Sequence, residues 1–128
     1  MAVTGAAGPI SNFLLAIIFA VLLRLAIMIS NTVSGNDIFF MTLFTLLDLS
    51  VMVNMSLAVF NLLPFPPLDG SRIFYVFLPP KLYFGVMKYE RYIMIGLMLL
   101  LFFGVLSNVI GGVTEYLTSG LYTLLGIY

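Results

Sequence analysis

The feature that most constrains this chain is an apolar run from about Pro9 to Ile29, in which Arg24 is the only charged residue. A helix needs about 20 mostly apolar residues to cross the hydrocarbon core of a bilayer. Pro9 suits a first helical turn, where its missing N–H costs little, and Arg24 can extend its charged head toward an interface. The run predicts a membrane-spanning helix over about residues 9–29.

Two further runs have the same character, from about Ile38 to Leu63 and from about Tyr92 to Ile110. The chain is 62% hydrophobic and 8% charged, whereas a soluble domain is about 45–50% apolar and about 25% charged. A water-soluble core of 128 residues could not bury this many apolar side chains. We therefore expect an all-α integral membrane protein, with about three transmembrane helices (9–29, 38–63 and 92–110) in a single domain over residues 1–128.

Missing residue types limit the chemistry of the chain. The net charge is zero, which does not indicate a nucleic-acid partner. The chain has no Cys and no His, so thiol chemistry and imidazole ligands are excluded from what it can do alone. No basic residue precedes Pro9, so this opening does not match a secretory signal peptide and resembles the interior of a longer sequence.

The second run contains polar residues at helical spacing. Asn54, Ala58 and Asn61 fall on one helical face, which we expect to look into the protein because polar groups in lipid are costly. For Asn54 a hydrogen bond to a neighbouring helix is the simpler interpretation. Asp48 points elsewhere and is expected to pair with another helix.

The segment 61–70 must break the helix, because Pro64, Pro66 and Pro67 remove backbone donors and clash with helical continuation. A short helix over 71–78 is expected next. The loop 81–91 has the densest charge, which predicts that it and the N-terminus are cytoplasmic.

The last part of the chain predicts two more elements. Gly96 and Gly104 share a face of the third run, where a neighbouring helix could approach closely. Gly111 and Gly112 are expected to end that helix. An amphipathic C-terminal helix over 113–127 should then lie in the membrane interface, with Thr114, Glu115, Thr118 and Ser119 on the side opposite its apolar residues. A short, partial fourth span is the alternative for this segment.

The broken segment is the candidate site. Irregular backbone at membrane depth is tolerated only where it is buried in protein or lines a water-filled cavity. Here it carries a carboxylate, Asp69, followed by Gly70. Taken alone, Asp69 could also cap the short helix that is expected to begin at Ser71, and a ligand and a cap are compatible roles.

The residues Asn61-Leu62-Leu63-Pro64-Phe65-Pro66-Pro67-Leu68-Asp69-Gly70 resemble the N-x-x-P-x-P-x-L-D-G signature of the site-2 protease family of intramembrane zinc metalloproteases. The residues Gly8-Pro9-Ile10-Ser11-Asn12 resemble that family's G-P-x-x-N motif, and the two motifs occur in the family's order. The likeness is closest to small bacterial members, which implies a bacterial cytoplasmic membrane.

The resemblance implies zinc as cofactor, transmembrane proteins as substrates and the lipid bilayer as surroundings. Asp69 would be a zinc ligand, and Asn61 would contact the substrate backbone or the developing oxyanion. Asn12 and Pro67 would contribute to substrate binding. The family's other zinc ligands and its general base lie in an H-E-x-x-H motif on an earlier helix.

That motif is absent here, so we expect the chain alone to be inactive as a protease. The histidines would come from an N-terminal segment missing through a truncated gene model or fragment, or from a partner chain. A degenerate, non-catalytic relative is a further explanation.

Two functions from other classes compete with the protease. A membrane scaffold would bind helices without cutting them. A fragment of a secondary transporter could also place a carboxylate in a broken helix, although transporters usually show paired repeats and this chain has none.

Overall fold

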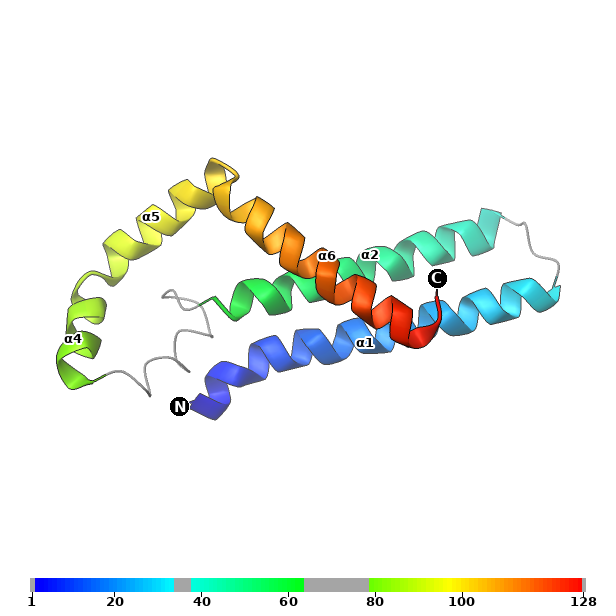
Figure 1. Cartoon of the computed structure of the whole chain (residues 1–128), viewed down its shortest axis with the longest axis horizontal. Coiled ribbons are helices and arrows are strands. Elements are labelled where there is room, and N and C mark those ends of the chain that lie inside the picture. The colour runs from blue at the N-terminus through cyan, green and yellow to red at the C-terminus, as the bar shows by residue number, and fades with distance from the viewer. Residues whose placement is uncertain (1, 34–37, 64–78, 128) are drawn as a thin grey trace.

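The computed structural model describes residues 2–33, 38–63 and 79–127, and this part of the chain is helical apart from short turns. Its helices are α1 (Ala2–Val33), α2 (Ile38–Asn61), α4 (Pro80–Lys88), α5 (Glu90–Phe102) and α6 (Val105–Leu125). In Figure 1, α1 and α2 lie side by side, α6 crosses over them, and α4 and α5 form an arm that extends away from the pair.

Among the described residues, two helices are long and apolar enough to cross a membrane: Ala6–Thr32 within α1, and Ile38–Asn61. A third span exists if α5 and α6, which are bent by 74° at their junction, are counted as one. The prediction of an all-α integral membrane protein is therefore confirmed.

Close packing joins α1 to α2. Ala16 and Ala20 of α1 are fully buried with Val51 and Met55 of α2 in the core cluster. Small side chains allow helix backbones in a bilayer to come close together, which increases van der Waals contact where lipid removes the hydrophobic driving force. The large side chains on the outer faces remain exposed, as lipid-facing residues should.

Helix α1 begins earlier than predicted. It starts at Ala2, so Pro9 lies inside the helix and not in its first turn. Membrane helices tolerate an internal proline where neighbouring groups accommodate the backbone, and Pro9 is buried here.

Helix α2 begins at the predicted residue, Ile38, and ends at Asn61. Leu62 and Leu63 form a turn with backbone bonds back to Ala58, Val59 and Phe60. The helix therefore stops where the proline-rich segment begins. The rest of the predicted break at 61–70 and the predicted helix at 71–78 lie outside the described residues.

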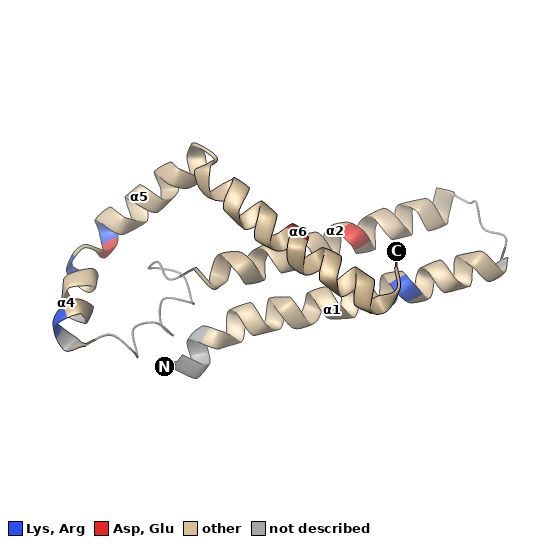
Figure 2. Ribbon diagram, in the orientation of Figure 1, with Lys and Arg blue, Asp and Glu red and all other residues tan. Residues whose placement is uncertain are grey.

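The predicted loop over 81–91 is wrong. Residues Pro80–Lys88 form α4, and α5 begins at Glu90 after a turn at Tyr89. Pro80 is preorganised for a first helical turn, and Lys88 in the last turn interacts favourably with the helix dipole. The basic residues Lys81, Lys88 and Arg91 therefore sit on helices at the end of the molecule that also holds the N-terminus, as Figure 2 shows.

A single helix over 92–110 is also wrong. The chain bends between Phe102 and Val105, where Gly104 has a φ of 73°. This left-handed conformation is strained for residues with a Cβ and suits glycine. Gly104 therefore forms a bend and not a close helix contact, and a Cβ on Gly96 would likewise meet no described atom within 4 Å.

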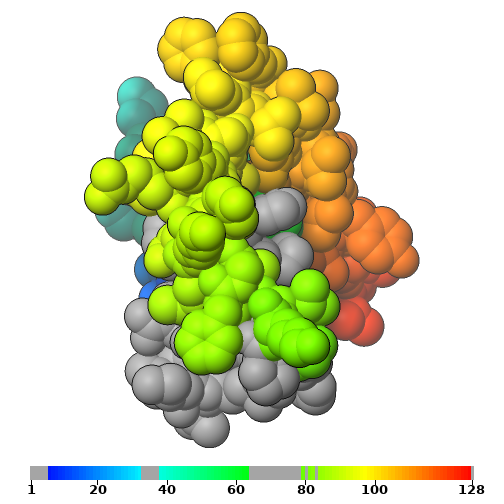
Figure 3. Space-filling model, turned by 90° about the vertical axis from the view of Figure 1, so that its left-hand side faces the viewer, coloured from blue at the N-terminus to red at the C-terminus, as the bar shows by residue number. Residues whose placement is uncertain are grey.

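The boundary expected at Gly111-Gly112 is not present, because both residues lie inside α6. The predicted helix over 113–127 is thus the latter part of a longer one. In Figure 3, seen from the α4 end, α4 and α5 stand in front and α6 lies to the right.

Two residues of the polar side of α6, Thr114 and Thr118, face inward, whereas Glu115 and Ser119 are exposed. Thr114 and Thr118 are buried against α2, whereas Tyr116 and Leu124 on the other side are 80% and 86% exposed. The prediction put these threonines on the polar side of an interfacial helix, whereas the structure buries both of them. In a bilayer the lipid-facing side is apolar and polar groups turn into the protein, which is the arrangement seen here.

Candidate functional site

The predicted site residues divide between described and undescribed parts of the chain. Asn12 is half-buried on α1, and Asn61 is the half-buried last residue of α2. The predicted zinc ligand Asp69 and the predicted substrate contact Pro67 lie outside the described residues.

The two motif regions meet at one end of the α1–α2 pair. A small apolar pocket of about 330 Å³ lies there. Its lining comes from α1, α2, the turn after α2 and α6: Pro9, Ile10, Phe13, Leu14, Ala58, Val59, Leu62 and Leu117. The G-P-x-x-N motif around Pro9 therefore lies next to the turn that leaves Asn61, although the motifs are far apart in sequence.

The expected inward face of α2 is partly realised. Ala58 is buried, and Asn54 and Asn61 are half-buried. The amide of Asn54 donates to the carbonyl of Ser50, 2.8 Å away on its own helix. The observed bond of Asn54 thus lies within α2, whereas the prediction was a hydrogen bond to another helix.

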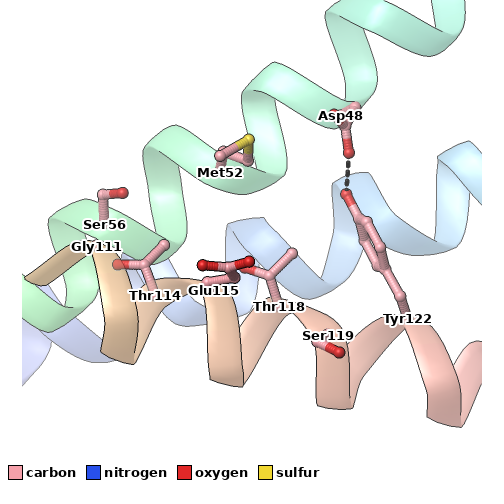
Figure 4. A pocket seen from close by; sticks show the side chains of 9 residues that line it. All are labelled: Asp48, Met52, Ser56, Gly111, Thr114, Glu115, Thr118, Ser119 and Tyr122. Atoms are coloured by element: carbon pink, nitrogen blue, oxygen red, sulfur yellow. Dashed lines mark hydrogen bonds between the residues drawn. The ribbon is translucent and has the colours of Figure 1, made fainter.

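A second feature is a polar groove between α2 and α6, named here the α2–α6 groove (Figure 4). It has a volume of about 620 Å³ and is lined by Asp48, Met52, Ser56, Gly111, Thr114, Glu115, Thr118, Ser119 and Tyr122. At one end the Tyr122 hydroxyl donates to Oδ1 of Asp48 at 2.5 Å. The prediction that Asp48 pairs with another helix is confirmed.

Both walls of this groove are built from four-residue steps. Asp48, Met52 and Ser56 form one row on α2, while Thr114, Thr118 and Tyr122 form the facing row on α6. Residues four apart share a helix face, so two such rows can lie against each other. The sequence predicts these polar residues of α6 on one side of an interfacial helix and does not predict that they face α2. Their spacing within a membrane protein was the signal that they face inward.

Changing Tyr122 to Phe should destabilise the fold. Tyr122 is almost fully buried, and the change removes the donor to the Asp48 carboxylate while it keeps the ring. Losing one such bond costs about 1–2 kcal/mol. The measurement is the midpoint of SDS-induced unfolding in mixed micelles. Tyr116→Phe, on the exposed side of the same helix, is the control and should leave the midpoint unchanged; equal shifts in both variants would contradict this role.

The described residues do not form a zinc centre by themselves. No group of three or more His, Cys, Asp or Glu side chains that could hold a metal comes together in the described ranges. The sequence has no His or Cys at all, while protein zinc sites use three or four ligands drawn from His, Cys, Asp and Glu. The described residues therefore do not fit zinc by themselves.

The helices define an all-α membrane protein. In it the Pro9 region of α1 lies next to the turn that follows Asn61 of α2. The model of the protein family described as "Peptidase family M50" matches residues 24–107. This match covers more than half of the chain and includes the segment from Asn61 to Gly70. The chain belongs to peptidase family M50, the site-2 protease family.

A curated relative supports this assignment. The chain is 37% identical over 91 residues to a Bacillus subtilis (strain 168) protein named "Putative zinc metalloprotease YwhC". The alignment covers 67% of this chain and 38% of the relative, so the chain spans well under two thirds of that protein's length. No solved structure matches the chain significantly.

Proposed function

We propose that this chain forms part of the catalytic core of an intramembrane zinc metalloprotease, which hydrolyses peptide bonds within transmembrane segments of other proteins. The observation that carries the proposal is the family match over residues 24–107, which includes the L-D-G carboxylate, Asp69. The closeness of the Pro9 region to the turn after Asn61 supports it.

Three side chains have proposed roles around the substrate. Asn61, at the end of α2, would contact the substrate backbone or the developing oxyanion, where a fixed amide donor favours the transition state. Asn12 and Pro67 would contribute to substrate binding. Asn12 is half-buried near the pocket that Pro9 lines, which suits a group that shapes a site.

Asp69 would be one zinc ligand, and the remaining donors must come from outside this sequence because it contains no His. A segment or partner chain with an H-E-x-x-H motif would provide them. By itself the chain would bind membrane helices without cutting them.

The proposed setting is the cytoplasmic membrane of a bacterium. Lys81, Lys88 and Arg91 gather on α4 and the start of α5, at the end of the molecule where α1 begins. Basic residues favour the cytoplasmic side, which would place this end and the N-terminus in the cytoplasm.

The test uses the protein produced from its native gene with an affinity tag after Tyr128. We expect the purified material to contain about one zinc ion per chain and to cleave members of a panel of tagged single-span membrane proteins. A zinc chelator should stop the cleavage. Material that binds these proteins but contains no zinc and cleaves none would instead establish a non-catalytic scaffold.

A further inference from the structure

Two buried hydroxyls in the α2–α6 groove lack partners. Thr114 and Thr118 are only 4% and 8% exposed, and their Oγ1 atoms have no hydrogen-bond partner in the part of the chain that the structure describes. Their side chains point from α6 toward α2 and line the groove (Figure 4). A buried polar group left without a partner is costly, so these hydroxyls call for a ligand.

Other hydroxyls of the chain behave differently. Six of them bond back to a carbonyl three or four residues earlier on the same helix: Ser11, Thr32, Thr42, Thr45, Ser50 and Thr123. This local bond is the usual way to satisfy a hydroxyl in a membrane helix. Thr114 and Thr118, by contrast, have no hydrogen-bond partner for Oγ1 among the residues that the structure describes.

The polar side chains that line the groove indicate the charge of that partner. All of them carry oxygen, and two, Asp48 and Glu115, are carboxylates. Among the residues that the structure describes, no Lys or Arg lines the groove. Arg24 is not among the residues that line the groove, and its guanidinium lies 3.6 Å from where a Cβ on Gly126, one helical turn beyond Tyr122, would be. Carboxylates within a membrane protein are costly without a compensating positive charge.

We propose that the α2–α6 groove binds a divalent cation that keeps part of its water shell. Oxygen ligands are those that hard cations prefer, and Mg²⁺ in particular is held by one or two carboxylates while it retains several waters. The volume of about 620 Å³ is far larger than a bare ion and leaves room for these waters. Thr114, Thr118 and Ser56 would then bond to the ion or its water shell.

This cation would join the two helices. Asp48 lies on α2 and Glu115 on α6, so a shared ion compensates one charge on each helix at their crossing. The described lining of this site does not include the turn after Asn61, where the proposed zinc-site segment begins.

Mn²⁺ is the probe, because it substitutes for Mg²⁺ and its free aquo ion is measured directly by electron paramagnetic resonance. The tagged protein is titrated in a non-ionic detergent at neutral pH. We expect about one Mn²⁺ bound per chain outside the zinc site, with Mg²⁺ competing for it. The double variant Asp48→Asn/Glu115→Gln should lose this binding.

A matched pair tests the hydroxyls. Thr118→Val removes one unpartnered hydroxyl with little change of shape and should weaken Mn²⁺ binding by about tenfold, as removal of supporting groups at metal sites does. Thr123→Val is the control, since its hydroxyl bonds to the Ser119 carbonyl and does not line the groove. Circular dichroism confirms that each variant is folded.

Asp69→Asn should retain this Mn²⁺ site, which separates it from the zinc site. The proposal is overturned if the folded protein binds no Mn²⁺. It is equally overturned if binding persists in the folded double variant, or if Asp69→Asn removes it. If the double variant does not fold, an unchanged Mn²⁺ affinity in Thr118→Val overturns the proposal.

Discussion

Replacing Asp69 by Asn in the protein produced from its native gene is expected to lower the cleavage rate by about 100-fold or more. Mutating groups that merely support a metal ligand costs about 10–100-fold in affinity or activity, and the proposed role of Asp69 is that of a ligand. Asparagine keeps the size of the side chain but removes its charge. The measurements are zinc per chain and cleavage of a tagged single-span protein.

The same experiment separates the ligand from the helix cap, which is the alternative role of this carboxylate. Asparagine caps helices about as well as aspartate does, whereas alanine does not and costs about 1 kcal/mol. A ligand therefore predicts loss of zinc in both Asp69→Asn and Asp69→Ala. A cap alone predicts full zinc and full activity in Asp69→Asn, with lower stability only in Asp69→Ala.

Asp37→Asn is the control for the loss of one negative charge, because Asp37 belongs to neither motif. It should retain both zinc and activity. If Asp37→Asn and Asp69→Asn reduce cleavage equally, Asp69 has no special role and the proposed zinc site is wrong.

The sequence was informative wherever local physics decides the structure. The first two spans follow from the length of apolar runs, and α2 begins at Ile38 as predicted and stops at Asn61, just before the prolines. These features depend on residues close together in the chain, so periodicity and proline chemistry suffice to locate them.

The predicted helix over 92–110 was wrong because glycine has two structural roles in membrane helices. A glycine in a membrane helix can permit close packing or supply a positive φ. Gly104 was assigned the first use and has the second, so one predicted span became the bent pair α5–α6. The pattern of apolar residues around Gly104 is the same in both cases and could not distinguish them.

The α2–α6 groove could not be predicted because its parts are far apart in sequence. Asp48 and Tyr122 are separated by 74 residues, and their pairing depends on how α6 crosses α2. The polar residues of α6 share one side of the helix in the sequence pattern. Such a side faces outward in water but faces the protein in a bilayer, so the pattern alone does not give its orientation. The zinc site rests on motif resemblance, because composition and spacing alone allowed Asp69 to be a cap.

Changing Met55 to Ala is expected to give the largest loss of stability among changes away from the motifs. Met55 and Val51 are the largest fully buried side chains in the described part of the chain, and both pack with Ala16, Ala20 and Tyr122. The change leaves a cavity where α1, α2 and α6 meet. Without Met55, the neighbouring side chains lose their van der Waals contacts on that side.

The size of the effect follows from the membrane setting. Large-to-small changes of this kind in soluble cores cost about 2–5 kcal/mol, which combines a transfer term and a cavity term. In a bilayer the transfer term nearly vanishes, because a methionine in a separated helix contacts lipid as apolar as the core. The cavity term remains, so we expect a loss of about 2 kcal/mol.

Met41→Ala is the matched control, since Met41 lies on the same helix and is 60% exposed. Its side chain faces lipid whether α1 and α2 are packed or apart, so the change should alter stability by about 0.5 kcal/mol or less. The measurement is again the midpoint of SDS-induced unfolding. Equal effects of Met41→Ala and Met55→Ala would mean that cavity formation does not govern the stability of the α1–α2 pair, and that the core cluster around Met55 does not hold these helices together.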